Sequence, residues 1–142
     1  MKGRERIHMR TRQVCVWLIA GALLAAAPAW AHHSFAAEFD VDKPVKLTGT
    51  LTKVEWVNPH AWFHIDVKSP DGQVTSWMIE AGSPNILLRR GFTRDTLQVG
   101  TVLVVTGYQA KDASNKANGK DITFPDGRKL LVGSSGSADA EK

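Results

Sequence analysis

Apolar side chains recur at every second position through most of residues 45–132, which is the period of β-strands. In the segment 61–68, alternate residues are large and apolar. The Ser-Pro-Asp-Gly stretch at 69–72 has the composition of a tight turn, and the segment 73–81 alternates again. These segments predict two antiparallel strands joined by a hairpin turn.

The segment 45–57 predicts a long first strand with a change of phase. Its apolar residues fall on odd positions at Leu47 and Leu51, and then on even positions at Val54 and Trp56. A phase change in one strand indicates a bulge or a sharp bend, which we expect beside Gly49. Such a strand can pair with different neighbours along its two halves.

The period changes after the third strand, where the sequence predicts a short helix. Ser83 and Pro84 are typical of a helix start, as an N-cap followed by proline at the first helical position, and Gly91 is typical of a helix end. We expect the apolar residues of this helix to close one end of the fold. These residues are Ile86, Leu87 and Leu88.

The rest of the chain returns to strands. Residues 97–110 predict a buried fourth strand, residues 111–120 a polar loop, and residues 121–132 a final strand region with a Pro-Asp-Gly turn. Three strands, a helix and two further strands are the order of an OB-fold. The sequence therefore predicts an all-β chain with a small α component, a five-stranded OB-fold-like barrel with one short helix between strands 3 and 4, over residues 45–132.

The N-terminus predicts an exported protein. A basic start, an apolar run too short to anchor the chain, and an Ala-Trp-Ala ending make residues 1–31 a signal peptide. Cleavage after Ala31 is expected, with cleavage after Ala29 as the alternative. Residues 32–44 then form an N-terminal lead-in segment, and residues 133–142 a polar, disordered tail. We expect a periplasmic protein with no stable membrane anchor after cleavage.

Removing the leader changes the charge and the cysteine content. The whole chain has a formal charge of +4, but the leader holds five of 18 basic residues and one of 14 acidic residues. The mature part is then neutral, which argues against a nucleic-acid partner. The only cysteine, Cys15, also lies in the leader, so neither a disulfide nor a thiolate metal ligand is expected.

Four stretches carry a resemblance to a known family. They are AHHSFAAEFD at 31–40, VEWVNPH at 54–60, GSPNILLRRGFTRD at 82–95 and PDGRKL at 125–130. Together they resemble the small exported proteobacterial proteins grouped as a domain of unknown function. The resemblance covers nearly all of the mature chain. It implies a compartment and a set of signature residues, but no activity.

The chain is also similar, more loosely, to the periplasmic copper and silver chaperone of efflux systems, a small OB barrel. This resemblance implies that His64 and Met78 hold Cu(I), with Trp62 or Trp77 as the capping tryptophan. The sequence departs from that pattern at one point. The closely spaced methionine pair of that family is missing, since Met78 is the only methionine outside the leader.

Alternation in the second and third strands independently predicts a candidate site. Extended residues at 60, 62, 64 and 66 point to one face, outward if Phe63 and Ile65 point inward. Met78 shares that face if Trp77 points inward. Imidazole, thioether and carboxylate groups together suit a late first-row metal, with copper as the first candidate and zinc as the second. The expected set is His60, His64 and Met78, with His32 or His33 folding over it.

Export adds a second candidate copper site at the N-terminus. Cleavage after Ala31 would leave His32 as the first residue, where its α-amine and imidazole together can chelate Cu(II). Cleavage after Ala29 would place His32 third, which also suits Cu(II). The alternatives are a frayed terminus for His32 and His33, a turn residue for His60, and a sheet-covering role for His64 and Met78.

The sequence offers little support for catalysis, because it has no nucleophile elbow, phosphate-binding glycine loop or HExxH motif. The leading hypothesis is a periplasmic, non-catalytic binding module, in its sharpest form a copper site. An interaction domain presenting the same face to a periplasmic protein, a glycan or a small ligand is the second hypothesis. A small metal-dependent enzyme is the third.

Overall fold

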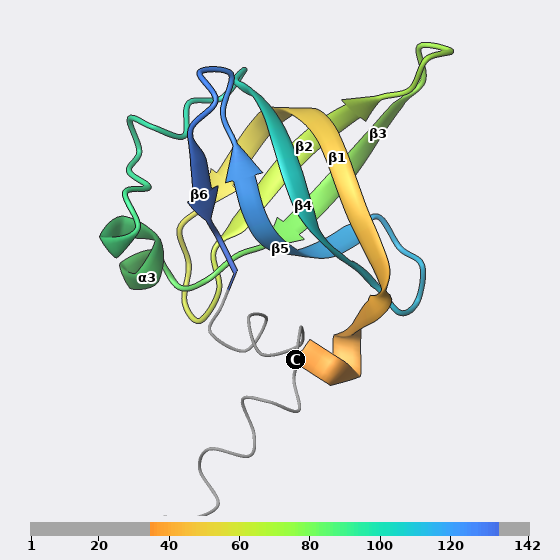
Figure 1. Cartoon of the computed structure of the whole chain (residues 1–142), viewed down its shortest axis with the longest axis horizontal. Helices are drawn as coiled ribbons and strands as arrows, with labels where there is room; N and C mark the ends of the chain where they lie inside the picture. The colour runs from red at the N-terminus through yellow and green to blue at the C-terminus, as the bar shows by residue number, and fades with distance from the viewer. Residues whose placement is uncertain (1–34, 134–142) are drawn as a thin grey trace, which may run out of the picture. The chain divides into compact units, whose positions relative to one another are not determined.

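The structure is a computed structural model that describes residues 35–133. One helical turn at 35–38 leads into a mostly β chain, as the alternation predicts (Figure 1). In chain order the elements are β1 (Phe39–Glu55), β2 (Trp62–Lys68), β3 (Val74–Glu80), α3 (Pro84–Arg89), β4 (Val102–Ala110), β5 (Lys116–Thr123) and β6 (Lys129–Leu131). No helix within 35–133 has the length and apolar character needed to span a membrane.

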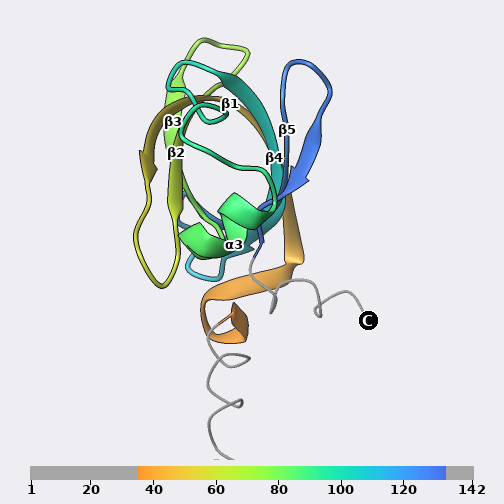
Figure 2. The same ribbon diagram turned by 90° about the vertical axis from the view of Figure 1, so that its left-hand side faces the viewer.

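Six strands, rather than the expected five, form one sheet in the order β3-β2-β1-β4-β5-β6. Neighbours in this order are antiparallel, and β3 also pairs with β5 in parallel through Met78 to Glu80. This extra pairing connects the first five strands in a ring, which is visible end-on in Figure 2. The sixth strand is three residues long and pairs only with β5.

β1 pairs with two neighbours along its length. Its first part pairs with β4 as far as Thr50, and its last part pairs with β2. The register slips between Leu51 and Lys53, so the predicted bulge lies at Thr52 rather than beside Gly49. Gly49 is crowded, because a Cβ there would lie 3.0 Å from the carbonyl oxygen of Asp66.

The helix α3 lies across one end of the ring (Figure 2) and follows the predicted signals. Ser83 occupies the N-cap position without a side-chain cap bond, Pro84 opens the helix, and Gly91 adopts a φ of 91°. Leu87 is fully buried, as expected. Leu88 is 53% exposed, so the prediction that it helps to close the core was wrong, because a two-turn helix turns only part of its surface inward.

The core fills the ring and is aromatic near α3. Phe92 packs between Phe63 and Phe124, with ring centroids 6.3 and 6.2 Å from its own. The inward residues of β2 and β4 complete this core, so the alternation identified the buried face correctly. They are Phe63, Ile65, Leu103 and Val105.

Two boundaries differ from the sequence prediction. β1 begins at Phe39, inside the segment expected to be a lead-in, and β5 begins at Lys116, inside the expected polar loop. The second difference has a clear cause. Residues 116–120 are polar or small, but the backbone of 116–118 pairs with β3 and that of 117–119 pairs with β4. The predicted signal peptide at 1–31, His32, His33 and most of the predicted tail lie outside the described residues.

Candidate binding face of β2 and β3

The outward side chains of β2 and β3 form the face that the alternation predicted. In the antiparallel register, His64 lies opposite Met78, and Trp62 lies opposite Glu80. Side chains directly opposite each other in such a pair are close neighbours. His64 and Trp62 are half-buried, whereas Met78 is 41% exposed. The structure therefore brings the predicted imidazole and thioether together.

His64 is held in place by a carboxylate from β1. Its Nε2 lies 2.8 Å from Oε1 of Glu55, and the same oxygen accepts a hydrogen bond from Lys53 at 2.6 Å. The hydrogen bonds from Lys53 and then His64 lower the pKa of Glu55 below its ordinary value. An ionised carboxylate only accepts, so Nε2 of His64 is the donor, and in the neutral imidazole Nδ1 is then the nitrogen with the lone pair.

His60 is held from a different direction. Its Nδ1 lies 3.1 Å from the carbonyl oxygen of Ala81 and 3.2 Å from Oε1 of Glu80. Because the carbonyl can only accept, Nδ1 is the donor, and in the neutral imidazole Nε2 is then the nitrogen with the lone pair. Both histidines of this face are thus oriented by an oxygen acceptor at one nitrogen, which leaves the other nitrogen able to accept a hydrogen bond or a metal.

Glu80 is unusual for a carboxylate because it is buried, with 7% of its surface exposed. Burial raises its pKa above the ordinary value, the charge of Glu38 adds to this effect, and His60 and Lys116 oppose it. Lys116 in turn forms an ion pair with Glu38 in the helical turn at 35–38. The N-terminal turn is therefore linked through charged groups to the edge of the β2–β3 face.

The two candidate tryptophans lie on opposite sides of the sheet. Trp77 is the β3 partner of the buried Ile65 and packs against the core. Trp62 shares the outward face with His64. Of the two, only Trp62 is placed to touch a ligand bound beside Met78.

The described residues do not assemble the full predicted metal site. Nowhere within 35–133 do three His, Cys, Asp or Glu side chains gather in a way that could hold a metal ion. His60 and His64 are engaged by different carboxylates, Glu80 and Glu55. The pairing of His64 with Met78 is the part of the predicted set that the structure brings together.

Sequence reasoning missed Glu55 as a partner of His64. Glu55 belongs to the first strand, and its register neighbour on β2 is Trp62. The bulge at Thr52 decides which β1 residues lie beside His64, and its position could not be read from the sequence. The only local signal was a glutamate at the end of an alternating strand, with a lysine two positions before it.

The sequence profile of a family of unknown function, DUF6152, matches residues 21–120. The chain belongs to this family. The match includes β1 to β4 and most of β5, so every residue of the candidate face described above lies within it. The family carries no assigned activity. No curated protein and no solved structure matches the chain.

Proposed function

We propose that the protein is an exported periplasmic binding module without catalytic activity, and that the outer face of β2 and β3 is its ligand surface. The observation that carries this proposal is the pairing of His64 with Met78 across the two strands, with Glu55 holding the far side of the imidazole. A half-buried Trp62 lies next to this pair on the same face.

The proposed architecture is an OB-fold. Two features support it: the strand ring in which β1 neighbours β2 and β4 while β3 pairs with β5, and the helix α3 between β3 and β4. OB-folds commonly bind ligands on the face formed by the second and third strands. The proposed ligand surface is that face.

The most specific form of the proposal is a copper site, with zinc as the second choice. A metal-binding histidine usually donates its other ring N–H to a carboxylate or a carbonyl. His64 with Glu55, and His60 with Ala81 and Glu80, have this arrangement. The thioether of Met78 favours Cu(I) over harder ions. His60, and the exported N-terminus with His32 or His33, would supply further ligands.

The test is a titration of the protein recovered after export, free of tags and with its first residue determined by intact mass. Cu(I), Cu(II) and Zn(II) are added in turn to the wild-type protein and to the variants His64→Ala and Met78→Leu. The matched control is Ser76→Ala, on the same outer face two residues before Met78. We expect Cu(I) affinity to fall by at least about tenfold in both ligand variants and to stay unchanged in the control.

The opposite result is equally clear. Unchanged affinity in His64→Ala together with loss of binding on acetylation of the N-terminus would reject the face as the metal site. It would place the metal at His32 instead. An absence of binding of all three ions would reject the metal proposal.

The second candidate is an interaction domain that presents the same face to a protein, a glycan or a small ligand. It is favoured by the outward position of Trp62 beside the exposed Met78, since half-buried aromatic and methionine side chains are typical of contact surfaces. Retention of a periplasmic partner by wild-type protein and by His64→Ala, but not by Trp62→Ala, would support it.

A further inference from the structure

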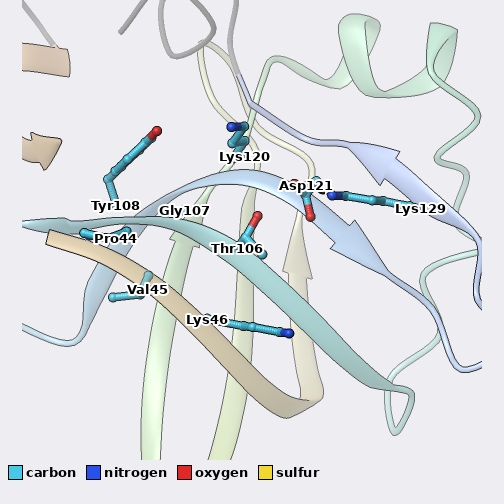
Figure 3. A pocket seen from close by; sticks show the side chains of 9 residues that line it. All are labelled: Pro44, Val45, Lys46, Thr106, Gly107, Tyr108, Lys120, Asp121 and Lys129. Atoms are coloured by element: carbon cyan, nitrogen blue, oxygen red, sulfur yellow. Dashed lines mark ion pairs between the residues drawn. The ribbon is translucent and has the colours of Figure 1, made fainter. Parts of the chain in front are cut away.

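Two of the hollows on the surface of residues 35–133 lie away from the β2–β3 face and differ in chemistry. One, of about 580 Å³ between β1, β4, β5 and β6, carries three lysines and an aspartate, and its Asp121 is already paired with Lys129 (Figure 3). The other, of about 250 Å³, lies beside α3 and is called the α3 pocket below. Its lining consists of three apolar side chains and one arginine, namely Trp56, Pro84, Leu88 and Arg94.

Two segments that are distant in the sequence build the α3 pocket. Trp56 directly follows the end of β1, whereas the other three residues belong to α3 or to the loop after it. Pro84 and Leu88 are four residues apart, so they lie on the same side of the helix. The neighbouring Leu87 is the helix residue that is fully buried in the core. The α3 pocket therefore uses the part of the helix surface that the core leaves free.

The apolar side chains of the α3 pocket remain accessible to a ligand. Leu88 is 53% exposed, and Trp56 and Pro84 are half-buried. Trp56 also packs against the core, which holds its position. Apolar walls with very few polar groups are typical of small-molecule sites, whose usual volumes are roughly 300–1,000 Å³. The α3 pocket is smaller than this, so its ligand is expected to be small.

Arg94 differs from the other arginines of residues 35–133, because its side chain makes no hydrogen bond or ion pair with any of these residues. The partners of the other three are the carbonyl oxygen of Asn85 for Arg89, the carbonyl oxygens of Leu131 and Gly133 for Arg90, and the carboxylate of Asp126 for Arg128. No acidic side chain lines the α3 pocket, since the adjacent Asp95 lines a different hollow. The pocket thus holds one positive charge without a counter-charge in its lining.

The backbone that carries Arg94 is fixed by a hydrogen-bonded turn. The N–H of Thr93 donates to Oγ1 of Thr96 at 2.8 Å, and the N–H of Thr96 donates to Oγ1 of Thr93 at 3.2 Å. Phe92 and Leu97, on either side of this turn, are buried in the core. The turn is therefore anchored before a ligand binds, which reduces the entropy that binding would cost.

We propose that the α3 pocket binds a small aromatic monocarboxylate. A guanidinium group presents its N–H donors in a planar fork that matches the two oxygens of a carboxylate. One arginine balances one negative charge, which favours a monocarboxylate over a dianion such as a phosphate monoester. The indole of Trp56 favours an aromatic ring, because aromatic pairs gain attraction beyond the burial of their area. Pro84 and Leu88 supply the rest of the apolar wall.

The experiment is a titration of the exported, tag-free protein with benzoate, benzyl alcohol and acetate at constant ionic strength. Binding is followed by the NMR shifts of the backbone amides and of the tryptophan indole N–H groups. We expect benzoate to shift the signals of Trp56 and of residues 84–94. Benzyl alcohol has the ring without the charge, and acetate has the charge without the ring. Each should bind roughly tenfold or more weakly than benzoate.

Three variants and one control test the assignment. Arg94→Gln should weaken benzoate binding by at least about tenfold, which corresponds to the loss of hydrogen bonds to a charged group. Arg94→Lys should weaken it less, because the charge remains while the fork is lost. Leu88→Ala should weaken it roughly fivefold through lost apolar contact. The matched control is Arg89→Gln, which removes an exposed arginine of α3 that does not line the pocket and should leave binding unchanged.

Arg94 and Leu88 are both exposed, so their variants are expected to keep the fold, and thermal unfolding checks this. Benzyl alcohol binding as tightly as benzoate to the wild-type protein would overturn the proposal, and so would equal weakening by Arg94→Gln and Arg89→Gln. Benzoate-induced shifts confined to β2 and β3 would overturn it as well. None of the four lining residues belongs to β2 or β3, so these outcomes do not depend on the proposed metal site.

Discussion

Nδ1 of His60 lies 3.2 Å from Oε1 of Glu80, a carboxylate that is only 7% exposed. Burial raises the pKa of Glu80, and His60 offsets only part of this increase. The ionised form of Glu80 is therefore accommodated in the fold at a cost, beside the charged pair of Glu38 and Lys116. The ionisation of Glu80 therefore makes the stability of the fold depend on pH.

Replacing Glu80 with glutamine should remove that dependence. With a raised pKa, the folded state holds the proton more tightly than the unfolded chain, so the contribution of Glu80 to stability is present at low pH. It is lost as pH rises from the unfolded value, about 4.3, through the raised folded value. Glu80→Gln should therefore gain stability relative to the wild type across that interval and hold the gain above it.

Urea unfolding of both proteins at a series of pH values measures this difference. The matched control is Asp42→Asn, at an exposed carboxylate of β1 that does not act on the pKa of Glu80. A stability difference between wild type and Glu80→Gln that stays constant with pH would contradict the prediction.

In the proposed copper site, Glu55 should control the metal affinity of His64 without controlling the fold. Its carboxylate accepts from Nε2 of His64 at 2.8 Å. Loss of such an outer partner typically weakens metal binding by roughly 10- to 100-fold. Glu55→Ala should show this loss of Cu(I) affinity with little change in the free energy of unfolding, because exposed ion pairs contribute little to stability.

The control for this prediction is Asp42→Ala, which removes an exposed carboxylate from the same strand. Competition titration with a Cu(I) chelator gives the affinities, and thermal unfolding gives the stabilities. Equal affinities for Glu55→Ala and Asp42→Ala would show that Glu55 does not orient a ligand.

Gly107 should tolerate no side chain. A Cβ at this position would lie 2.1 Å from the carbonyl oxygen of Asn118, so the backbones of β4 and β5 would have to separate. Gly107→Ala should cost about 3 kcal/mol, at the upper end of the usual cost of overpacking. Gly100→Ala has open space around it and only a positive φ of 92° to strain, so it should cost about 1 kcal/mol. Chemical denaturation of the two variants gives the comparison, and equal losses would contradict it.

Adjacent leucines in α3 should behave differently. Leu87 is fully buried and Leu88 is 53% exposed. Leu87→Ala should cost roughly 2–5 kcal/mol through lost burial and a cavity. Leu88→Ala should change stability by less than about 0.5 kcal/mol. Thermal unfolding of the two single variants, each a control for the other, would show whether α3 packs with this face inward.

Much of the fold could be predicted because alternation is a local property of an extended backbone. The outward grouping of His64 and Met78, and the inward position of Phe63, follow from the period of two. The helix start at Ser83 and Pro84 was also readable, because capping depends on adjacent residues. The first part of β5 could not be predicted, because its residues are polar or small and show no apolar period. Only its pairing with β3 and β4 makes it a strand.

The chain's own pattern was thus enough to indicate a β-rich protein, one short helix and a face carrying an imidazole beside a thioether. Which carboxylate holds His64 and how β3 meets β5 were decided by packing between distant segments. The physical reason is that register between strands is set by bulges and by the closing of the ring. A shift of a single residue there exchanges every side chain between the two faces.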